Sequence, residues 1–206
     1  MRTDGAWYGA SAVQGWRTGE LWTLQAEPGT PYFNKPPLVF WIHGLVLDVF
    51  GTGPLQARLP TVFAAGLCVL ATVGICRAAG GVTRHGAATA GVMLALTVEF
   101  FRRTREISLD MWQTAVMMLA AWAFAHALRS RSGRWALFGG VPIGLALLCK
   151  PFMALLSLVL LSVWLTWRGG WRFLPWCLGS CGVALVVAGP WHGSMLLLHG
   201  NVFTSQ

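Results

Sequence analysis

The sequence predicts an all-α, polytopic integral membrane protein, and composition carries most of this prediction. Hydrophobic residues make up 55% of the 206 residues, charged residues only 11%, and the mean hydropathy is +0.59. A water-soluble fold of this length needs more charge to cover its surface. The formal net charge of +8 comes from 15 Lys and Arg residues scattered in small groups between apolar stretches. This scatter indicates membrane topology rather than a nucleic-acid-binding face.

Residues 1–54 are expected to form a loop on the outer face of the membrane that contains two amphipathic interfacial helices. Apolar residues recur near helical spacing between Asp4 and Leu24, separated by polar positions. A turn at Glu27-Pro28-Gly29 follows. The next apolar segment, Leu38 to Phe50, is too short to span a bilayer and is therefore predicted to be the second interfacial helix.

Residues 55–189 are expected to form the membrane-spanning bundle. Six apolar segments separated by charges are candidate spans: 59–76, 86–101, 109–128, 135–149, 151–167 and 173–189. Some are shorter than the ~20 residues that a bilayer requires. Flanking aromatic residues and snorkelling cations such as Lys150 would complete those crossings. Residues 190–206 are interpreted as the truncated start of a further outer-face segment.

The distribution of charge between alternate loops predicts the orientation of the bundle. One set of loops carries seven arginines and no acidic residue: Arg77, Arg84, Arg129, Arg131, Arg134, Arg168 and Arg172. The positive-inside trend places this set in the cytoplasm. All seven acidic residues fall on the other side, so any chemistry is expected on the extracytoplasmic face. Arg102, Arg103 and Arg105 also fall there, against the trend, which suggests an anionic ligand.

Lys35 occupies an unusual position between aromatic residues and a proline pair. Pro36 and Pro37 lack backbone N–H donors and bias the residues before them toward extended conformations. Lys35 is therefore expected on a stiff loop immediately before an apolar helix. It is either directed at a site or is a solvated lysine beside an aromatic membrane-interface anchor.

Other charged residues at the outer ends of the spans have both a functional and a structural interpretation. Asp110 opens a span near Arg105, so it is either half of an ion pair or part of a polar site that faces the bundle interior. For Asp4, the structural alternative is a cap of the first amphipathic helix. Lys150 and Arg58 have the alternative of snorkelling cations.

Cysteines and histidines give little support for a metal site. The five cysteines lie in or at the end of apolar stretches and are interpreted as small apolar residues, not disulfides. His192 and His199 follow the last span, where lone histidines are more often interfacial than ligands. The sequence also lacks a Walker loop, GxGxxG and HExxH.

Six short motifs follow one another along the chain. They are Thr3-Asp4-Gly5-Ala6-Trp7-Tyr8, Tyr32-Phe33-Asn34-Lys35-Pro36-Pro37, Ala57-Arg58-Leu59-Pro60, Arg105 with Asp110, Gly144 to Lys150, and Pro190-Trp191. In this order they resemble the lipid-carrier-dependent glycosyltransferases of the GT-C fold, specifically the aminoarabinose transferases and protein O-mannosyltransferases. Each motif alone is weak, but the ordered set is specific and the resemblance covers essentially the whole chain.

The resemblance implies transfer of a sugar from a polyprenyl-phosphate-linked donor, undecaprenyl phosphate in bacteria, to a lipid, protein or glycan acceptor. It implies a multi-pass protein of the inner (plasma) membrane with an extracytoplasmic active face. Asp4 would be the general base or would orient the acceptor, and Asp110 would support the site or bind the sugar. The residues implied to bind the donor phosphate are Lys35, Arg58, Arg105 and Lys150. Those implied to contact substrate are Tyr8, Tyr32 and Trp191.

The sequence departs from the family pattern in two places. In some relatives an acidic residue precedes the motif lysine and helps to bind a divalent metal, whereas this chain has Asn34, which puts metal dependence in doubt. The family normally has a transmembrane helix before the Asp loop, and more helices and an outer domain after the Pro-Trp pair. The chain is therefore interpreted as a fragment, and its 206 residues alone are expected to be inactive.

Two other functions compete with the transferase. A transporter or flippase component would have charges along a translocation path, and Gly139, Gly140 and Pro142 inside a span favour it. The charged residues nevertheless fall at the outer ends of the spans, as an outer-face transferase requires. A purely structural membrane subunit would leave the outer arginines and Asp110 unexplained.

Overall fold

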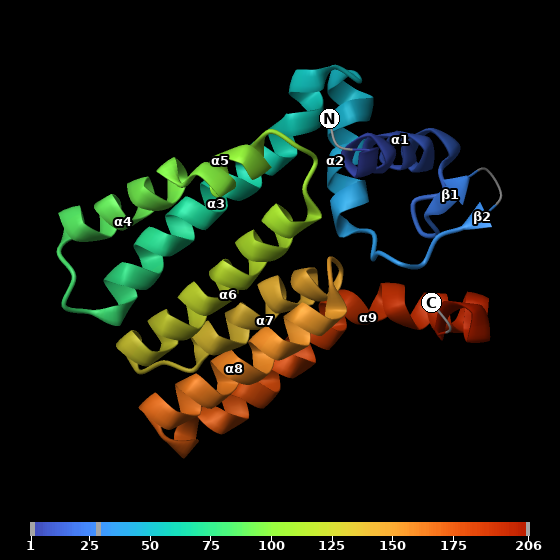
Figure 1. Ribbon diagram of the computed structural model, residues 1–206. Helices are drawn as coiled ribbons and strands as arrows, with labels where there is room; N and C mark the ends of the chain where they lie inside the picture. The colour runs from blue at the N-terminus through green and yellow to red at the C-terminus, as the bar shows by residue number, and fades with distance from the viewer. Residues whose placement is uncertain (1–2, 28–29, 205–206) are drawn as a thin grey trace.

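The chain is almost entirely helical, as predicted (Figure 1). The computed structural model describes residues 3–27 and 30–204. A small antiparallel pair of strands, β1 (Gln25–Glu27) and β2 (Thr30–Pro31), lies between the first two helices. The all-α fold class is therefore confirmed, with this short ribbon as an addition that the sequence analysis did not include.

Helices α1 (Thr3–Thr18) and α2 (Leu38–Phe50) pack against each other beside the ribbon. Their contact depends on a tryptophan that lies over a glycine. A Cβ atom on Gly44 of α2 would lie 2.0 Å from the Trp16 ring, so the close approach requires glycine. The Trp16 indole donates a hydrogen bond to the carbonyl oxygen of Trp41 (3.0 Å), and the Trp41 indole donates to that of Leu21 (2.6 Å). These bonds fix α1 and the following loop on α2.

The remaining helices form the bundle. They are α3 (Pro54–Ala79), α4 (Arg84–Leu96), α5 (Val98–Thr104), α6 (Leu109–Ser130), α7 (Arg134–Leu147), α8 (Pro151–Gly169), the 3₁₀ turn η1 (Trp171–Phe173) and α9 (Leu174–Thr204). Helix α6 packs against α3, α7 and α8, and α7 packs closely on α9. Figure 1 shows α1 and α2 at one end of this bundle, and the α3–α4, α6–α7 and α8–α9 connections at the other.

Within the described residues, four stretches are long and apolar enough to cross a membrane: Pro54–Ala79, Leu109–Ser130, Pro151–Gly169 and Trp171–Gly200. Helix α7 is shorter, and the expected span 86–101 is two helices. Thr97 interrupts it with an extended backbone (φ −66°, ψ 126°) while its hydroxyl donates to the Met93 carbonyl (3.0 Å). A hydroxyl that bonds the backbone in this way competes with the helical pattern. Helix α9 continues through Pro190, beyond the expected end of the last span at residue 189.

Two of the glycines inside α7, Gly140 and Gly144, are explained by close packing on α9, whereas Gly139 packs on Phe124 of α6. A Cβ on Gly140 would lie 2.5 Å from the Ser180 carbonyl oxygen, and one on Gly144 would lie 2.6 Å from Cβ of Val187. The Ser180 hydroxyl also donates to the carbonyl of Ala136 (2.6 Å). Small residues allow helices in a membrane to approach this closely. This packing role removes Gly140 as an argument for a transporter.

Candidate functional site

The start of helix α6 presents a carboxylate at the end of the bundle near α1 and α2. Ser108 is the N-cap residue, and its hydroxyl accepts a hydrogen bond from the backbone N–H of Met111 (3.2 Å). Asp110 lies in the first turn, where the positive end of the helix dipole stabilises a negative side chain. The carboxylate is about half exposed. A capped helix terminus therefore determines the position of Asp110.

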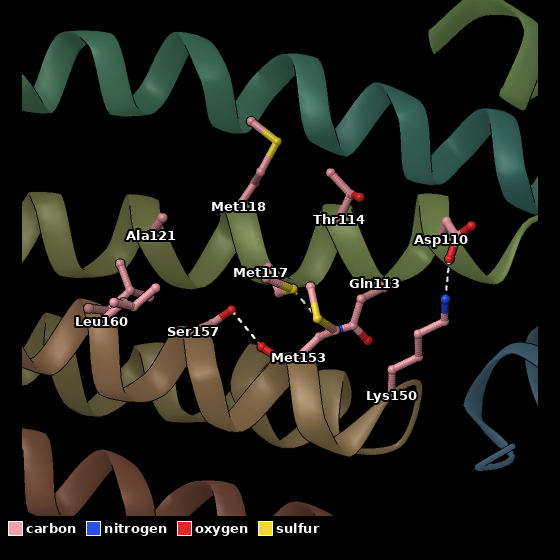
Figure 2. A pocket seen from close by; sticks show the side chains of 11 residues that line it. Asp110, Gln113, Thr114, Met117, Met118, Ala121, Lys150, Met153, Ser157 and Leu160 are labelled. Carbon is pink, nitrogen blue, oxygen red and sulfur yellow. Dashed lines mark hydrogen bonds and ion pairs between the residues drawn. The ribbon is translucent and has the colours of Figure 1, made fainter. Parts of the chain in front are cut away.

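Two cations from other segments flank this carboxylate. The Lys150 ammonium donates a hydrogen bond to Oδ1 of Asp110, as Figure 2 shows. Arg103, near the end of α5, places Nη1 3.7 Å from Oδ2. Lys150 has an extended backbone (φ −145°, ψ 100°) because it precedes Pro151 at the start of α8. The connection between α7 and α8 thus carries a lysine directly to the α6 terminus.

The loop that contains Lys35 is fixed against the same connection. The backbone N–H of Leu38 donates a hydrogen bond to the carbonyl oxygen of Leu148 (3.1 Å). Pro36 and Pro37 are buried, whereas Lys35 is half-buried. The loop is therefore held against the α7–α8 connection, and Lys35 and Lys150 line the same cavity.

These segments enclose a small polar cavity of about 130 Å³. The chain has two lysines, Lys35 and Lys150, and both line this cavity. The full lining is Gly5, Tyr8, Lys35, Arg103, Glu106, Ile107, Ser108, Leu109, Asp110 and Lys150. The side chain of Asp4 lies outside the described part of the structure, but its neighbour Gly5 forms part of the wall.

A larger and mainly apolar groove of about 540 Å³ runs between α6 and α8 from the same point. Asp110 and Lys150 line both hollows. Figure 2 shows these two charged residues at one end of the groove and Leu160 and Ala121 toward the other. The remaining lining residues are Gln113, Thr114, Met117, Met118, Met153, Ser157 and Leu161. The arrangement suits a ligand with an anionic group and a long apolar chain.

The other residues proposed from the sequence have different positions. Tyr8 lines the polar cavity. Tyr32 is separated from Tyr8 by the ring of Trp7. The ring centroid of Tyr32 lies 4.7 Å from that of Trp7, and Trp7 in turn contacts Tyr8. Trp191 is buried, and its indole donates to the Trp22 carbonyl (2.9 Å), which joins α9 to the loop after α1.

Neither Arg58 nor Arg105 is among the residues that line the two hollows. The arginine that pairs with Asp110 is Arg103, not the expected Arg105, because α5 ends at Thr104 and leaves Arg105 exposed. Arg103 Nε also donates to Oε1 of Glu99 (2.8 Å). Glu99 and Arg103 are four residues apart on one helix, and this spacing is the sequence signal that could have identified Arg103 as the positioned arginine.

The described side chains provide no obvious metal centre. Across residues with described side chains, no three His, Cys, Asp or Glu groups come together, and all five cysteines are free. Asn34 is exposed.

The fold and the site define an integral membrane protein of the helical-bundle class, with a charged cavity at the end of an apolar groove. Residues 34–192 match the family described as dolichyl-phosphate-mannose-protein mannosyltransferase, and the chain belongs to that family. Family membership agrees with the resemblance read from the six motifs.

Individual relatives agree with this family assignment. The chain is 31% identical over 189 residues to the undecaprenyl phosphate-alpha-4-amino-4-deoxy-L-arabinose arabinosyl transferase of Pseudomonas aeruginosa (strain LESB58), covering 88% of this chain and 34% of the relative. It is 26% identical over 175 residues to the corresponding transferase 1 of Sodalis glossinidius, with 82% and 31% covered. The chain therefore spans about a third of the length of the curated relatives it matches.

Solved structures support the same fold. ArnT from Cupriavidus metallidurans in the apo state superposes with a TM-score of 0.82 at 25% identity, covering 97% of this chain and 39% of ArnT. ArnT bound to undecaprenyl phosphate superposes with a TM-score of 0.83, also at 25% identity, over 97% and 38% of the two chains.

Proposed function

We propose that this chain forms the donor-binding part of a glycosyltransferase of the extracytoplasmic membrane face. The enzyme transfers a sugar from a polyprenyl-phosphate-linked donor, undecaprenyl phosphate in bacteria, to a lipid, protein or glycan acceptor. The observation that carries the proposal is the pair of adjoining hollows that share Asp110 and Lys150. One is small and charged, and the other is large and mostly apolar.

A polyprenyl phosphate has parts that match both hollows. Its phosphate would lie in the polar cavity, where Lys35, Lys150 and Arg103 supply positive charge. Its isoprenoid chain would follow the α6–α8 groove between methionine and leucine side chains. Methionine is flexible and fills irregular apolar space, which suits a long branched chain. The relatives and the ArnT structure whose names include undecaprenyl phosphate support this assignment.

The charged groups have separate roles in the proposed transfer. A nucleophilic group of the acceptor attacks the anomeric carbon of the sugar, and the bond between that carbon and the phosphate oxygen breaks. The bonding electrons leave with the polyprenyl phosphate, so negative charge develops on its phosphate. Lys35 and Lys150 stabilise this charge where water is scarce. The acceptor proton passes to a carboxylate.

Asp4 is the proposed base, and Asp110 is proposed to position the lysine and the sugar. Asp110 is engaged by Lys150 and Arg103, which lowers its availability as a base. Asp4 precedes Gly5, a wall residue of the cavity. Arg58, Arg105, Tyr32 and Trp191 line neither hollow, so no direct contact with the donor is assigned to them.

The test is transfer of radiolabelled sugar from polyprenyl-phosphate-sugar lipids in membranes that contain the full-length gene product. Asp4→Asn and Lys35→Ala are compared with wild type at equal expression. Both substitutions are expected to lower transfer by roughly 10²-fold or more, as losses of a base or of a charge stabiliser do. Arg17→Gln, an exposed change on α1, is the control and should leave transfer intact.

Two outcomes would count against the transferase. If neither Asp4→Asn nor Lys35→Ala alters transfer, the site assignment is wrong. If the protein moves the intact donor lipid across the membrane without transferring sugar, the flippase alternative replaces it.

A further inference from the structure

A second groove lies at the opposite end of α6 from Asp110. It has a volume of about 470 Å³ and lies between α3 and α6. Its lining residues are Leu70, Val73, Gly74, Arg77, Ala78, Trp122, His126 and Arg129. Because α6 has 22 residues and rises ~1.5 Å per residue, its two ends are roughly 30 Å apart. The groove is therefore separate from the donor site.

Two arginines from different helices meet at this groove. The Arg129 guanidinium donates a hydrogen bond to the backbone carbonyl oxygen of Arg77, in the last turn of α3. Cations near a helix C-terminus are favoured there, and this contact fixes the position of Arg129. A guanidinium has five N–H donors, so most of those on Arg129 remain for another partner. Among the described side chains, no carboxylate lies within 4.0 Å of either arginine.

The wall of the groove away from the arginines is apolar and includes an indole. A Cβ atom on Gly74 would lie 2.2 Å from the Trp122 ring, so Trp122 lies directly over the α3 backbone. Leu70, which lies on α3 one turn before Gly74 and about two turns before Arg77, is 61% exposed. The arginine end of the groove is thus continuous with its apolar wall along α3 and α6. A lipid chain could therefore run along this wall beside the bundle.

Charge at this end of the molecule is of one sign. The sequence has no Asp or Glu between Asp48 and Glu99, and none after Asp110. The arginine-rich connections at 77–84, 129–134 and 168–172 all lie at this end (Figure 1). The positive-inside trend places it at the cytoplasmic surface. The cytoplasmic leaflet contains anionic lipids, which basic pockets between transmembrane helices bind.

From these observations we infer that the α3–α6 groove binds an anionic phospholipid of the cytoplasmic leaflet. The lipid phosphate lies between Arg77 and Arg129, and one acyl chain runs along Leu70 and Trp122. This site is independent of the proposed donor site and of sugar transfer.

Native mass spectrometry of the detergent-purified chain tests the inference directly. The protein is titrated with dioleoylphosphatidylglycerol or with dioleoylphosphatidylcholine, and the bound fraction is compared. Wild type is expected to retain phosphatidylglycerol at least five times better than phosphatidylcholine. Arg77→Gln with Arg129→Gln is expected to abolish this preference.

The matched control is Arg84→Gln with Arg168→Gln, which removes the same charge from the same end without touching the groove. It should keep the preference. Leu70→Trp provides a second variant that fills the exposed groove wall without changing charge, and it should lower phosphatidylglycerol binding even if the double arginine variant is unstable.

Three results would overturn the inference. The first is equal loss of lipid binding in the control and the groove variant, which would indicate a general effect of net charge. The second is unchanged binding in Leu70→Trp. The third is displacement of the lipid by millimolar inorganic phosphate, which would indicate a site for a free anion.

Discussion

The backbone N–H of Leu38 and the carbonyl oxygen of Leu148 are joined by a hydrogen bond of 3.1 Å. This bond connects the beginning of α2 to the connection between α7 and α8, although the two segments are far apart in the chain. Lys35 and Lys150 each lie within three residues of one of its ends, and both line the same polar cavity. This backbone hydrogen bond therefore brings together the two segments that carry the lysines.

The contact between Lys150 and Asp110 is expected to matter for activity much more than for stability. Both side chains are substantially exposed, and exposed ion pairs contribute only ~0–1 kcal/mol to folding. Asp110→Asn should therefore leave the Tm in detergent almost unchanged while lowering sugar transfer by roughly 10²-fold. A large fall in Tm with little loss of transfer would support the purely structural interpretation of this pair.

Arg103 and Arg105 form a matched comparison. Arg103 lines the cavity and lies 3.7 Å from Asp110, whereas Arg105 is exposed and does not line it. Arg103→Gln should weaken binding of undecaprenyl phosphate about 5- to 10-fold, which corresponds to ~1 kcal/mol, and Arg105→Gln should change it less than twofold. Affinity is measured by titration in detergent. The opposite ranking would restore Arg105 to the donor site.

The close contact between α7 and α9 should make Gly140 important for the stability of the fold. Gly140→Ala places a methyl group 2.5 Å from the Ser180 carbonyl oxygen, so α7 and α9 must move apart. Overpacking of this kind costs ~1–3 kcal/mol, and the Tm in detergent should fall by several degrees. Gly182→Ala is the control because a methyl group there meets nothing within 4 Å. Equal Tm values for the two variants would contradict the packing role.

His43 should make stability depend on pH. It is 1% exposed on α2, and Nε2 lies 3.5 Å from the Thr61 hydroxyl oxygen. Burial lowers the pKa of His43 from 6.5 to about 4, so folding favours the neutral imidazole. The resulting stability is complete above the unfolded pKa of 6.5 and is lost as the pH falls toward about 4.

A comparison of Tm at pH 7.5 and pH 4.5 measures this effect. Wild type should lose more stability over the interval than His43→Gln, which cannot titrate there, by up to ~3 kcal/mol. Parallel pH profiles for the two proteins would show that His43 is not buried in the neutral form.

Much of the bundle was predictable because membrane helices have a strong local signal. Apolar length and flanking charge locate the helix regions, and the thirteen residues of α2 are too few to cross a bilayer. The break at Thr97 was missed, because a single threonine within an apolar run does not reveal its backbone conformation. The continuation of α9 through Pro190 was missed for a related reason, since proline indicates a boundary but tolerates a continuing helix in membranes.

The sequence analysis named several residues that the structure brings together, but it could not predict their geometry. The ordered motifs included Lys35, Asp110 and Lys150, which the structure brings together. Spacing alone favoured Arg105 as the partner of Asp110, because the short helix α5 and its end at Thr104 could not be located. Trp191 belongs to one of the motifs, but its position could not be predicted either. It is buried in a contact between α9 and the loop after α1 and does not line the cavity.

We propose above all that the two converging lysines, Lys35 and Lys150, bind the phosphate of a polyprenyl carrier. The most direct test is titration of the purified chain with undecaprenyl phosphate and with undecaprenol, which lacks the phosphate. Wild type should bind the phosphate at least tenfold more tightly, and Lys35→Gln should lose most of that difference while Arg17→Gln keeps it. Equal affinity for the two lipids in wild type, or an undiminished difference in Lys35→Gln, would contradict the claim.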